Sequence, residues 1–168
     1  MLRGARLPQW LLGDAWPQGG GVPALADIEL RDGLVMHVTP SSDAAPQGAD
    51  VWHLNGTLAL PGFVDAHVHL DKAFTLARIA DVQPGLLGAI EASGRDLPGW
   101  TPDDIRTRAT RGLQWAHEAG TLRLRTHINW AEIGPLPMAW PVLAELSREW
   151  APRLTLELVS LTKLISLV

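Results

Sequence analysis

The sequence predicts an α/β fold, namely an incomplete (β/α)8 TIM-type barrel of about three parallel strands, preceded by a small β-sheet unit. Strand-like and helix-like segments alternate after Pro61-Gly62, which is typical of parallel βαβ units. The strands have one polar face, as expected where they line the interior of a barrel. The part after Leu60 of the 168-residue chain is less than half of the about 250 residues of a complete barrel.

Residues 1–60 are predicted to form the β-sheet unit from short strands and turns. Arg31-Asp32-Gly33 separates two alternating segments within residues 26–38, which predicts a hairpin. Asn55-Gly56 separates two further strand-like runs within residues 51–60, and this dipeptide is a strong hairpin signal. We therefore expect two hairpins in this unit.

Residues 61–168 are predicted to form the first part of the barrel. The clearest helix lies between Thr101, a suitable N-cap, and Gly120, a suitable C-terminal stop. Its apolar face is formed by residues at helical spacing, Ile105, Ala109, Leu113 and Ala116. The predicted strands are 63–70, 121–130 and 154–161, and the other helices are 86–92, ending at Gly94, and 138–150.

Alternation along the first two of these strands separates polar from apolar side chains. A parallel strand covered by helices on both sides is usually apolar on both faces. Here one face of each strand is polar, which favours a barrel with an active-site mouth over an open sheet. The residues of the polar faces are Phe63, Asp65, His67 and His69, and then Arg123, Arg125, His127 and Asn129; the helix-covered face of the second strand is Leu122, Leu124, Thr126 and Ile128.

His67 and His69 stand at i and i+2 on the first strand and therefore point the same way. Their Cα atoms should lie roughly 7 Å apart, which lets both imidazoles reach one cation. By themselves they are either two polar residues that share a face or half of a metal site.

Composition excludes several classes of function. A net charge of -4 and a pI of about 5.8 leave no basic surface for nucleic acid or anionic membranes. No apolar run is long enough to span a membrane, and the N-terminus lacks the features of a signal peptide, so we expect a cytoplasmic protein. With no cysteine, the chain cannot be a nucleobase deaminase of the PCxxC type, and any metal must be bound by nitrogen and oxygen.

The stretch "LALPGFVDAHVHLDKAF" resembles the first barrel strand of the amidohydrolase superfamily. The preceding hairpins look like part of the small β-sandwich of these enzymes. "HLDK" together with the later "GTLRLRTHINW" is most similar to the cytosine-deaminase-like branch, and the resemblance covers about residues 24–162. It implies that His67 and His69 are metal ligands.

The resemblance further implies a hydrolase that attacks a C–N bond of a nitrogen heterocycle, a cyclic amidine of the cytosine type. A divalent ion, Zn or Fe, would activate water for this attack. In the family, the remaining ligands and the proton carriers come from later strands, so no catalytic residue is assigned here. We expect an N-terminal fragment or truncated product that is inactive alone. The sequence does not decide whether the chain forms a homo-oligomer.

Other polar residues have two interpretations each. Asp71 and Lys72 are substrate-pocket candidates, with a loop salt bridge as the alternative for each. His127 is a candidate for substrate contact or for support of the ligands, or else an inward polar residue satisfied by a neighbour. Asp65 and Arg125 are expected to form a buried ion pair that Glu157 could join.

Two alternatives to the deaminase hypothesis remain at this point. Lys163 lies near the position where cytosine deaminases often have a glutamine, so either cytosine itself is in doubt as the substrate or the terminal residues are out of frame. A dihydroorotase- or hydantoinase-like cyclic amide hydrolase is one alternative, and its bridging carboxylated lysine would lie on a later strand. A non-catalytic partial barrel that serves as an assembly module is the other.

Overall fold

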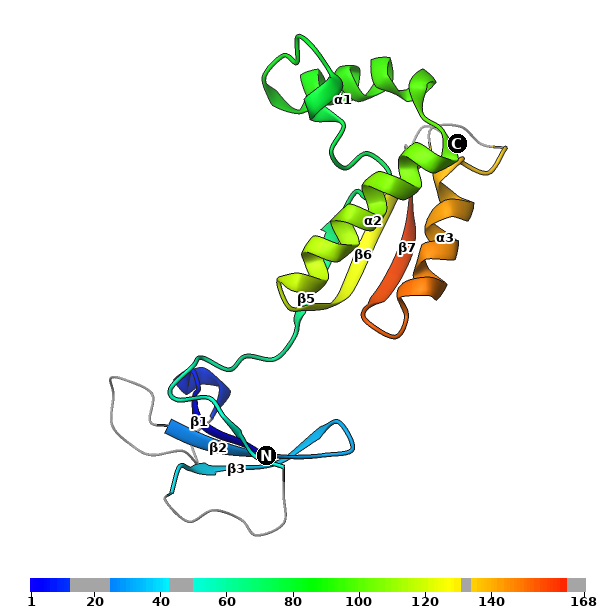
Figure 1. Ribbon diagram of the computed structural model, residues 1–168. Helices are drawn as coiled ribbons and strands as arrows, with labels where there is room; N and C mark the ends of the chain where they lie inside the picture. Colours follow the sequence, from blue (N-terminus) through cyan, green and yellow to red (C-terminus); the bar gives the residue numbers. More distant parts are fainter. Residues whose placement is uncertain (13–24, 43–49, 131–133, 163–168) are drawn as a thin grey trace. The chain divides into compact units, whose positions relative to one another are not determined.

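The computed structural model describes residues 1–12, 25–42, 50–130 and 134–162 (Figure 1). It contains two compact units, Met1–Pro61 and Gly62–Val168. The fold is mixed α/β. In the second unit, the strands are parallel and are joined by βαβ connections. No helix in these described ranges is both long and apolar enough to cross a bilayer.

The first unit is built on one sheet, with strand order β3-β2-β1-β4. β1 pairs antiparallel with β2 and parallel with β4, and β2 pairs antiparallel with β3. Its small core consists of Ala5, Leu7, Ala26 and Ile28. The elements are β1 (Leu2–Arg6), the short 3-10 helix η1 (Gln9–Leu11), β2 (Leu25–Arg31), β3 (Leu34–Pro40) and β4 (Trp52–His53).

The first predicted hairpin is confirmed, because β2 and β3 pair around a two-residue turn. Asp32 and Gly33 have φ angles of 52° and 78°. Positive φ at both central residues is the requirement of a type I′ turn, which suits the twist of paired strands.

The second predicted hairpin is wrong. Asn55 and Gly56 do form a turn, with φ angles of 51° and 81°, closed by one bond from the Thr57 amide to the Leu54 carbonyl (2.9 Å). Beyond that bond the runs on either side pair with β1 and form no ladder with each other. The amide of Leu54 donates to the carbonyl of Arg3 (2.8 Å), and that of Ala59 donates to Arg6 (2.9 Å). The edge of β1 competes successfully for both runs, and the turn itself bonds there, since the Gly56 amide donates to the Gly4 carbonyl at 2.7 Å.

Asp27 is a buried carboxylate in this unit, 3% exposed. Its side chain accepts hydrogen bonds from the Gly4 amide (2.9 Å) and the Ser41 hydroxyl (2.8 Å), and Arg3 lies 3.5 Å away. Burial by itself raises the pKa of Asp27, but these hydrogen bonds, one from the Ser42 amide and the charge of Arg3 together lower it. The charged form of Asp27 therefore stabilises the folded unit.

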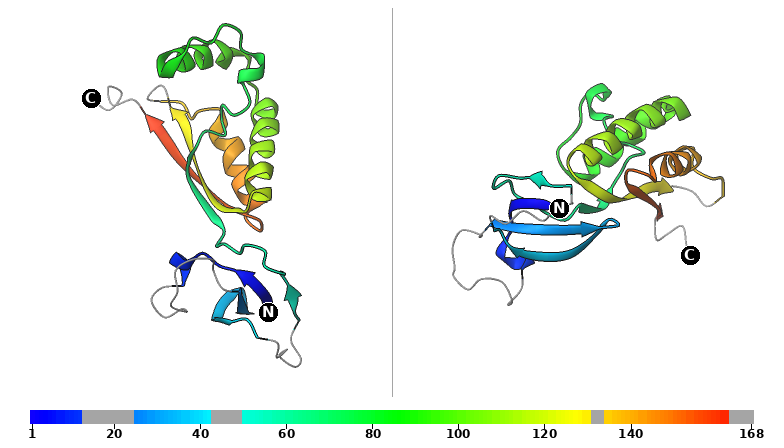
Figure 2. Two further views of the ribbon diagram at one scale, coloured as in Figure 1. Left: turned by 90° about the vertical axis from the view of Figure 1, so that its left-hand side faces the viewer. Right: turned by 60° about the horizontal axis from the view of Figure 1, so that its bottom comes forward.

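The second unit is a parallel three-stranded sheet in the order β5-β6-β7. Helices α2 and α3 lie along the same face of this sheet (Figures 1 and 2). The strands are β5 (Phe63–Val68), β6 (Thr121–Trp130) and β7 (Thr155–Thr162), and the helices are α1 (Gly85–Asp96), α2 (Pro102–Glu118) and α3 (Ala139–Trp150), with short 3-10 helices η3 (Leu76–Arg78) and η4 (Leu97–Gly99).

The predicted apolar face of α2 is confirmed. Ile105, Ala109 and Leu113 are fully buried, and they share one core with α3 and the helix-covered side of β6. Thr101 caps the helix by accepting a hydrogen bond from the Asp104 amide at 3.1 Å. At the other end Gly120 has a φ of 87°, which suits a helix stop.

Two local predictions are wrong. α1 runs through Gly94 to Asp96, because an interior glycine weakens a helix without ending it, whereas Pro98 offers no N–H to continue it. Leu122 was expected under the helices but is 55% exposed. A register shift pairs the neighbours of Leu122 with Phe63 and Val64 and leaves Leu122 without a partner in β5.

We predict that Asp27→Asn lowers the stability of the first unit by about 2 kcal/mol at pH 7, since hydrogen bonds to a buried charge are lost. Because folding lowers the pKa of Asp27, its contribution is complete above the unfolded value of about 4 and disappears as pH falls through the folded value. Amide hydrogen exchange in β2 and β3 at several pH values measures both effects.

The matched control is Glu29→Gln on the same strand, since the exposed pair of Glu29 with Arg31 should contribute little. An Asp27→Asn effect that is as large at pH 3 as at pH 7 would contradict the role of the charge.

Candidate metal centre

Three histidines meet where β5 and β6 run side by side. His67 lies on β5, His69 directly follows that strand, and His127 lies on β6. The ring centroids of His67 and His127 are 4.0 Å apart and nearly parallel, at 18°. His67 is exposed and the other two are half-buried, so the cluster is accessible from one side.

His67 and His69 converge through their Nε2 atoms, which are 3.3 Å apart. Two nitrogen ligands at about 2.0–2.1 Å from a tetrahedral zinc ion lie about 3.3–3.4 Å from each other. The spacing of the two imidazoles therefore fits a shared tetrahedral ion.

The tautomer of His69 follows from its other nitrogen. Nδ1 of His69 lies 2.8 Å from the backbone carbonyl oxygen of His127. A carbonyl can only accept, so Nδ1 donates and carries the proton in the neutral ring. Nε2 of His69 then carries a lone pair, which accepts from Nε2 of His67 in the metal-free chain. A proton on Nδ1 and a lone pair on Nε2 is also the arrangement that metal-bound histidines show.

His127 contributes both its backbone and its ring to this cluster. Its Nδ1 is buried without a hydrogen-bond partner among the described residues. Burial lowers the pKa of His127, as do nearby His67, His69 and Arg125, while a hydrogen bond with the Val68 backbone opposes them. These effects therefore favour the neutral form of the ring.

Asp71 follows the two histidines and is 1% exposed. Its Oδ2 accepts a hydrogen bond from the Asn129 amide at 3.0 Å, and its Oδ1 has no partner in the described part of the chain. Lys72 is half-buried, and its backbone forms a turn with His69 and Thr75. Neither Asp71 nor Lys72 takes part in an ion pair with the residues described.

Arg108 is a buried cation near this loop that sequence reasoning missed. It extends from α2 and is 7% exposed. Its Nη1 donates to the carbonyls of Asp71 (2.8 Å) and Ala73 (2.9 Å), and Asp104 accepts from its Nε and Nη2. The available signal was its position beside Ala109, three residues after Ile105, on the apolar face of the helix.

The expected buried ion pair of Asp65 with Arg125 is wrong. Arg125 pairs with Glu157 at 2.8 Å, and its side chain is 49% exposed. Asp65 instead accepts a hydrogen bond from the amide of His67 at 3.2 Å. On this open face the charges stay hydrated, so the two strands impose no pairing between Asp65 and Arg125.

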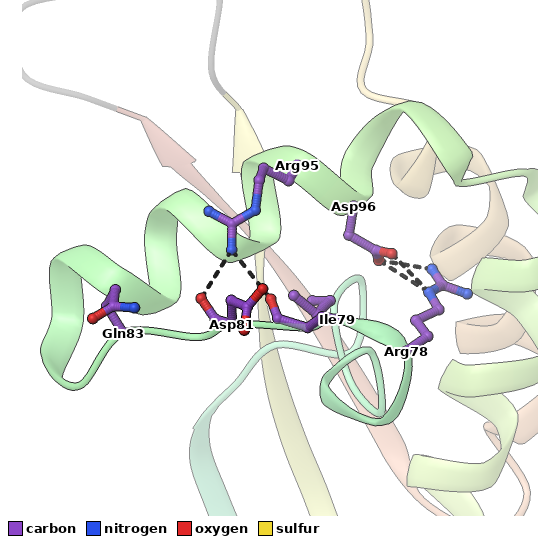
Figure 3. A pocket seen from close by; sticks show the side chains of 7 residues that line it. Arg78, Ile79, Asp81, Gln83, Arg95 and Asp96 are labelled. Carbon is purple, nitrogen blue, oxygen red and sulfur yellow. Dashed lines mark hydrogen bonds and ion pairs between the residues drawn. The ribbon is translucent and has the colours of Figure 1, made fainter.

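A pocket of about 510 Å³ lies between α1 and the segment before it (Figure 3), and none of the three histidines lines it. Its two arginines already have partners. Arg78 pairs with Asp96, and Arg95 points at the carbonyls of Ala80 and Asp81. The guanidinium groups of both arginines are therefore engaged within the chain and offer few N–H groups to an anionic ligand.

Within residues 1–12, 25–42, 50–130 and 134–162 no group of three His, Asp or Glu side chains is arranged to hold a metal. A catalytic zinc site uses three protein ligands. The histidine pair is thus an incomplete ligand set by itself. Lys163 lies outside the described residues.

Comparison with known proteins gives consistent similarities, although no family model matches the chain. The pterin deaminase of Rhizobium rhizogenes is 30% identical over 138 residues, which are 81% of this chain and 31% of the relative. The crystal structure of 5-methylcytosine deaminase from Klebsiella pneumoniae liganded with 5-fluorocytosine superposes with a TM-score of 0.69 and 25% identity. The match covers 95% of this chain and 35% of that one.

A third similarity supports the fold alone. N-isopropylammelide isopropylaminohydrolase from Burkholderia multivorans superposes with a TM-score of 0.64 at 21% identity, over 95% of this chain and 36% of that one. The chain thus spans about a third of the length of each of these relatives. The pterin deaminase and the 5-methylcytosine deaminase indicate that the matched part of this chain belongs to the amidohydrolase superfamily, in its deaminase branch.

Proposed function

We propose that the chain forms the first part of a metal-dependent amidohydrolase that removes an amino group from a nitrogen heterocycle containing a cyclic amidine. In this proposal, residues 1–60 belong to a small β-sandwich and residues 61–168 to a (β/α)8 barrel. The observation that carries it is the pair of His67 and His69, with Nε2 atoms 3.3 Å apart and the His69 proton held on Nδ1 by the His127 carbonyl.

His67 and His69 would hold a divalent ion, Zn or Fe. When bound, such an ion lowers the pKa of water and supplies hydroxide at neutral pH. His127 orients His69 through its carbonyl and, being neutral, adds no positive charge to repel a cation. Asp71, Lys72 and His127 are the substrate-pocket candidates of this chain.

Pterin, 5-methylcytosine and N-isopropylammelide in the names of the similar proteins support a heterocyclic substrate. Their shared chemistry is a nitrogen attached to a ring carbon that hydroxide can attack. The absence of cysteine and the net charge of -4 support a cytoplasmic location without a nucleic-acid partner.

Two imidazoles leave the ion short of the three protein ligands that catalytic zinc sites use. We therefore propose that turnover requires donors beyond the described residues, from a longer polypeptide or from a second chain. In the second case the chain would be an assembly module and not an enzyme by itself.

We predict weak, substoichiometric binding of Zn²⁺ or Co²⁺ by the chain, because two ligands form a poor site. The double substitution His67→Ala/His69→Ala should abolish it, as measured by metal content after dialysis. The matched control is His37→Ala/His53→Ala, which removes two exposed histidines of the first unit. Equal retention by both double variants would exclude the proposed ligands.

We predict no ammonia release from pterin, cytosine or aminotriazines by the chain alone, since its ligand set is incomplete. Robust turnover by the unmodified chain would refute the need for further donors.

A chimera tests the deaminase proposal directly. The aligned part of this chain replaces its counterpart in the Rhizobium pterin deaminase, which supplies the rest of the enzyme. We expect ammonia release from pterin, measured with a coupled assay, and its loss in the chimera carrying His69→Ala. A folded chimera that has metal and no activity, or whose activity survives His69→Ala, would count against the proposal.

A further inference from the structure

The loop that follows β5 is attached to its surroundings at several points. The Leu70 amide donates to the hydroxyl of Thr126, a fully buried residue of β6, at 3.0 Å. The Asp71 side chain accepts from the Asn129 amide, also on β6. These bonds attach the backbone directly after His69 to the strand whose His127 carbonyl orients the His69 ring.

Arg108 attaches the same loop to α2 from the opposite side. One of its terminal nitrogens is shared by the carbonyls of Asp71 and Ala73, at 2.8 and 2.9 Å. The Asp71 carbonyl belongs to a turn in which the Lys72 amide donates to the His69 carbonyl, and the Ala73 carbonyl directly follows that turn. Figure 1 shows α2 lying along β5 and β6, which is what brings Arg108 within reach of the turn.

The guanidinium of Arg108 is itself held in place. Asp104, one helical turn earlier, accepts from its Nε (3.0 Å) and Nη2 (2.9 Å). The Trp100 ring lies 5.0 Å from its central carbon, in a cation–π contact. Every nitrogen of the planar fork thus has an acceptor, and a lysine could not reproduce this arrangement.

We propose that Arg108 is a positioning residue for the metal pair: by clamping the carbonyls of Asp71 and Ala73, it holds the backbone that sets the His69 ring. This inference rests on the proposed metal-binding function of His67 and His69. Arg108 would act indirectly, because its hydrogen bonds end at the backbone of the loop and do not reach either imidazole. Groups that hydrogen-bond directly to metal ligands change metal affinity by about 10–100-fold, and for a residue that acts through the backbone we expect the lower end of this range.

The test compares Arg108→Lys with Arg106→Lys. Arg106 lies on the same helix but is exposed and pairs only with Glu145 and Glu149 of α3. Co²⁺ affinity, followed by titration of the visible absorption, should weaken about tenfold or more in Arg108→Lys. It should stay within about twofold in Arg106→Lys, with thermal unfolding measured for both.

A second measurement uses the unmodified, metal-free chain, so that it decides even where Arg108→Lys fails to fold. ¹⁵N spectra should show the Nδ1–H tautomer of His69, and the amides of Leu70, Lys72 and Asn129 should be protected from hydrogen exchange. Fast exchange of these amides would overturn the clamp. In folded Arg108→Lys we expect mixed tautomers of His69 and faster exchange of the Lys72 amide.

The outcomes separate the two proposals. If the unmodified chain binds no Co²⁺ at all, the metal proposal fails, while the tautomer and exchange data on folded Arg108→Lys, compared with the unmodified chain, still decide whether Arg108 positions His69. If the chain binds Co²⁺ and folded Arg108→Lys binds it equally well, the positioning role is refuted. Equal weakening by Arg106→Lys would also refute it, since the effect would then reflect general stability.

Discussion

The parallel pairing of β5 with β6 is the constraint on which the candidate site depends. It places the end of β5 beside the His127 carbonyl, and that carbonyl determines which nitrogen of His69 carries the proton. The stacking of His67 on His127 and the bond of Asp71 to Asn129 cross the same strand pair. Without this pairing the histidines would be two flexible surface side chains with no common orientation.

Elements with strong local signals were predictable from the sequence. The limits of α2 follow from Thr101 and Gly120, and its buried face follows from spacing alone. Leu124, Thr126 and Ile128 lie under the helices as strand alternation predicts. Such features depend on a few neighbouring residues, so tertiary competition seldom changes them.

Apart from the end of α1, what failed depended on competition between distant segments. The runs around Asn55-Gly56 had a free edge of β1 available, and the local sequence pattern does not predict pairing with that edge. Leu122 is displaced by a register shift against β5, which alternation within one strand cannot reveal. The partner of Arg125 was misassigned for the same reason, since Asp65 and Glu157 on the two flanking strands are equally plausible in sequence.

The proposed site was predictable in its residue types and not in its support. Two histidines at i and i+2 are visible in the sequence, but the Nδ1 bond of His69 goes to a backbone carbonyl, which any residue could supply. Arg108 looks like an ordinary helix arginine until its burial against the turn is known. A hydrogen bond to a backbone carbonyl cannot be predicted from residue types, because every residue has that acceptor.

The order of strands in the second unit has a consequence for how the chain behaves in solution. In the described residues, β5 and β7 are outer strands with one neighbour each, and β6 alone is paired on both sides. Each outer strand therefore presents a row of backbone N–H and C=O groups that another strand can use.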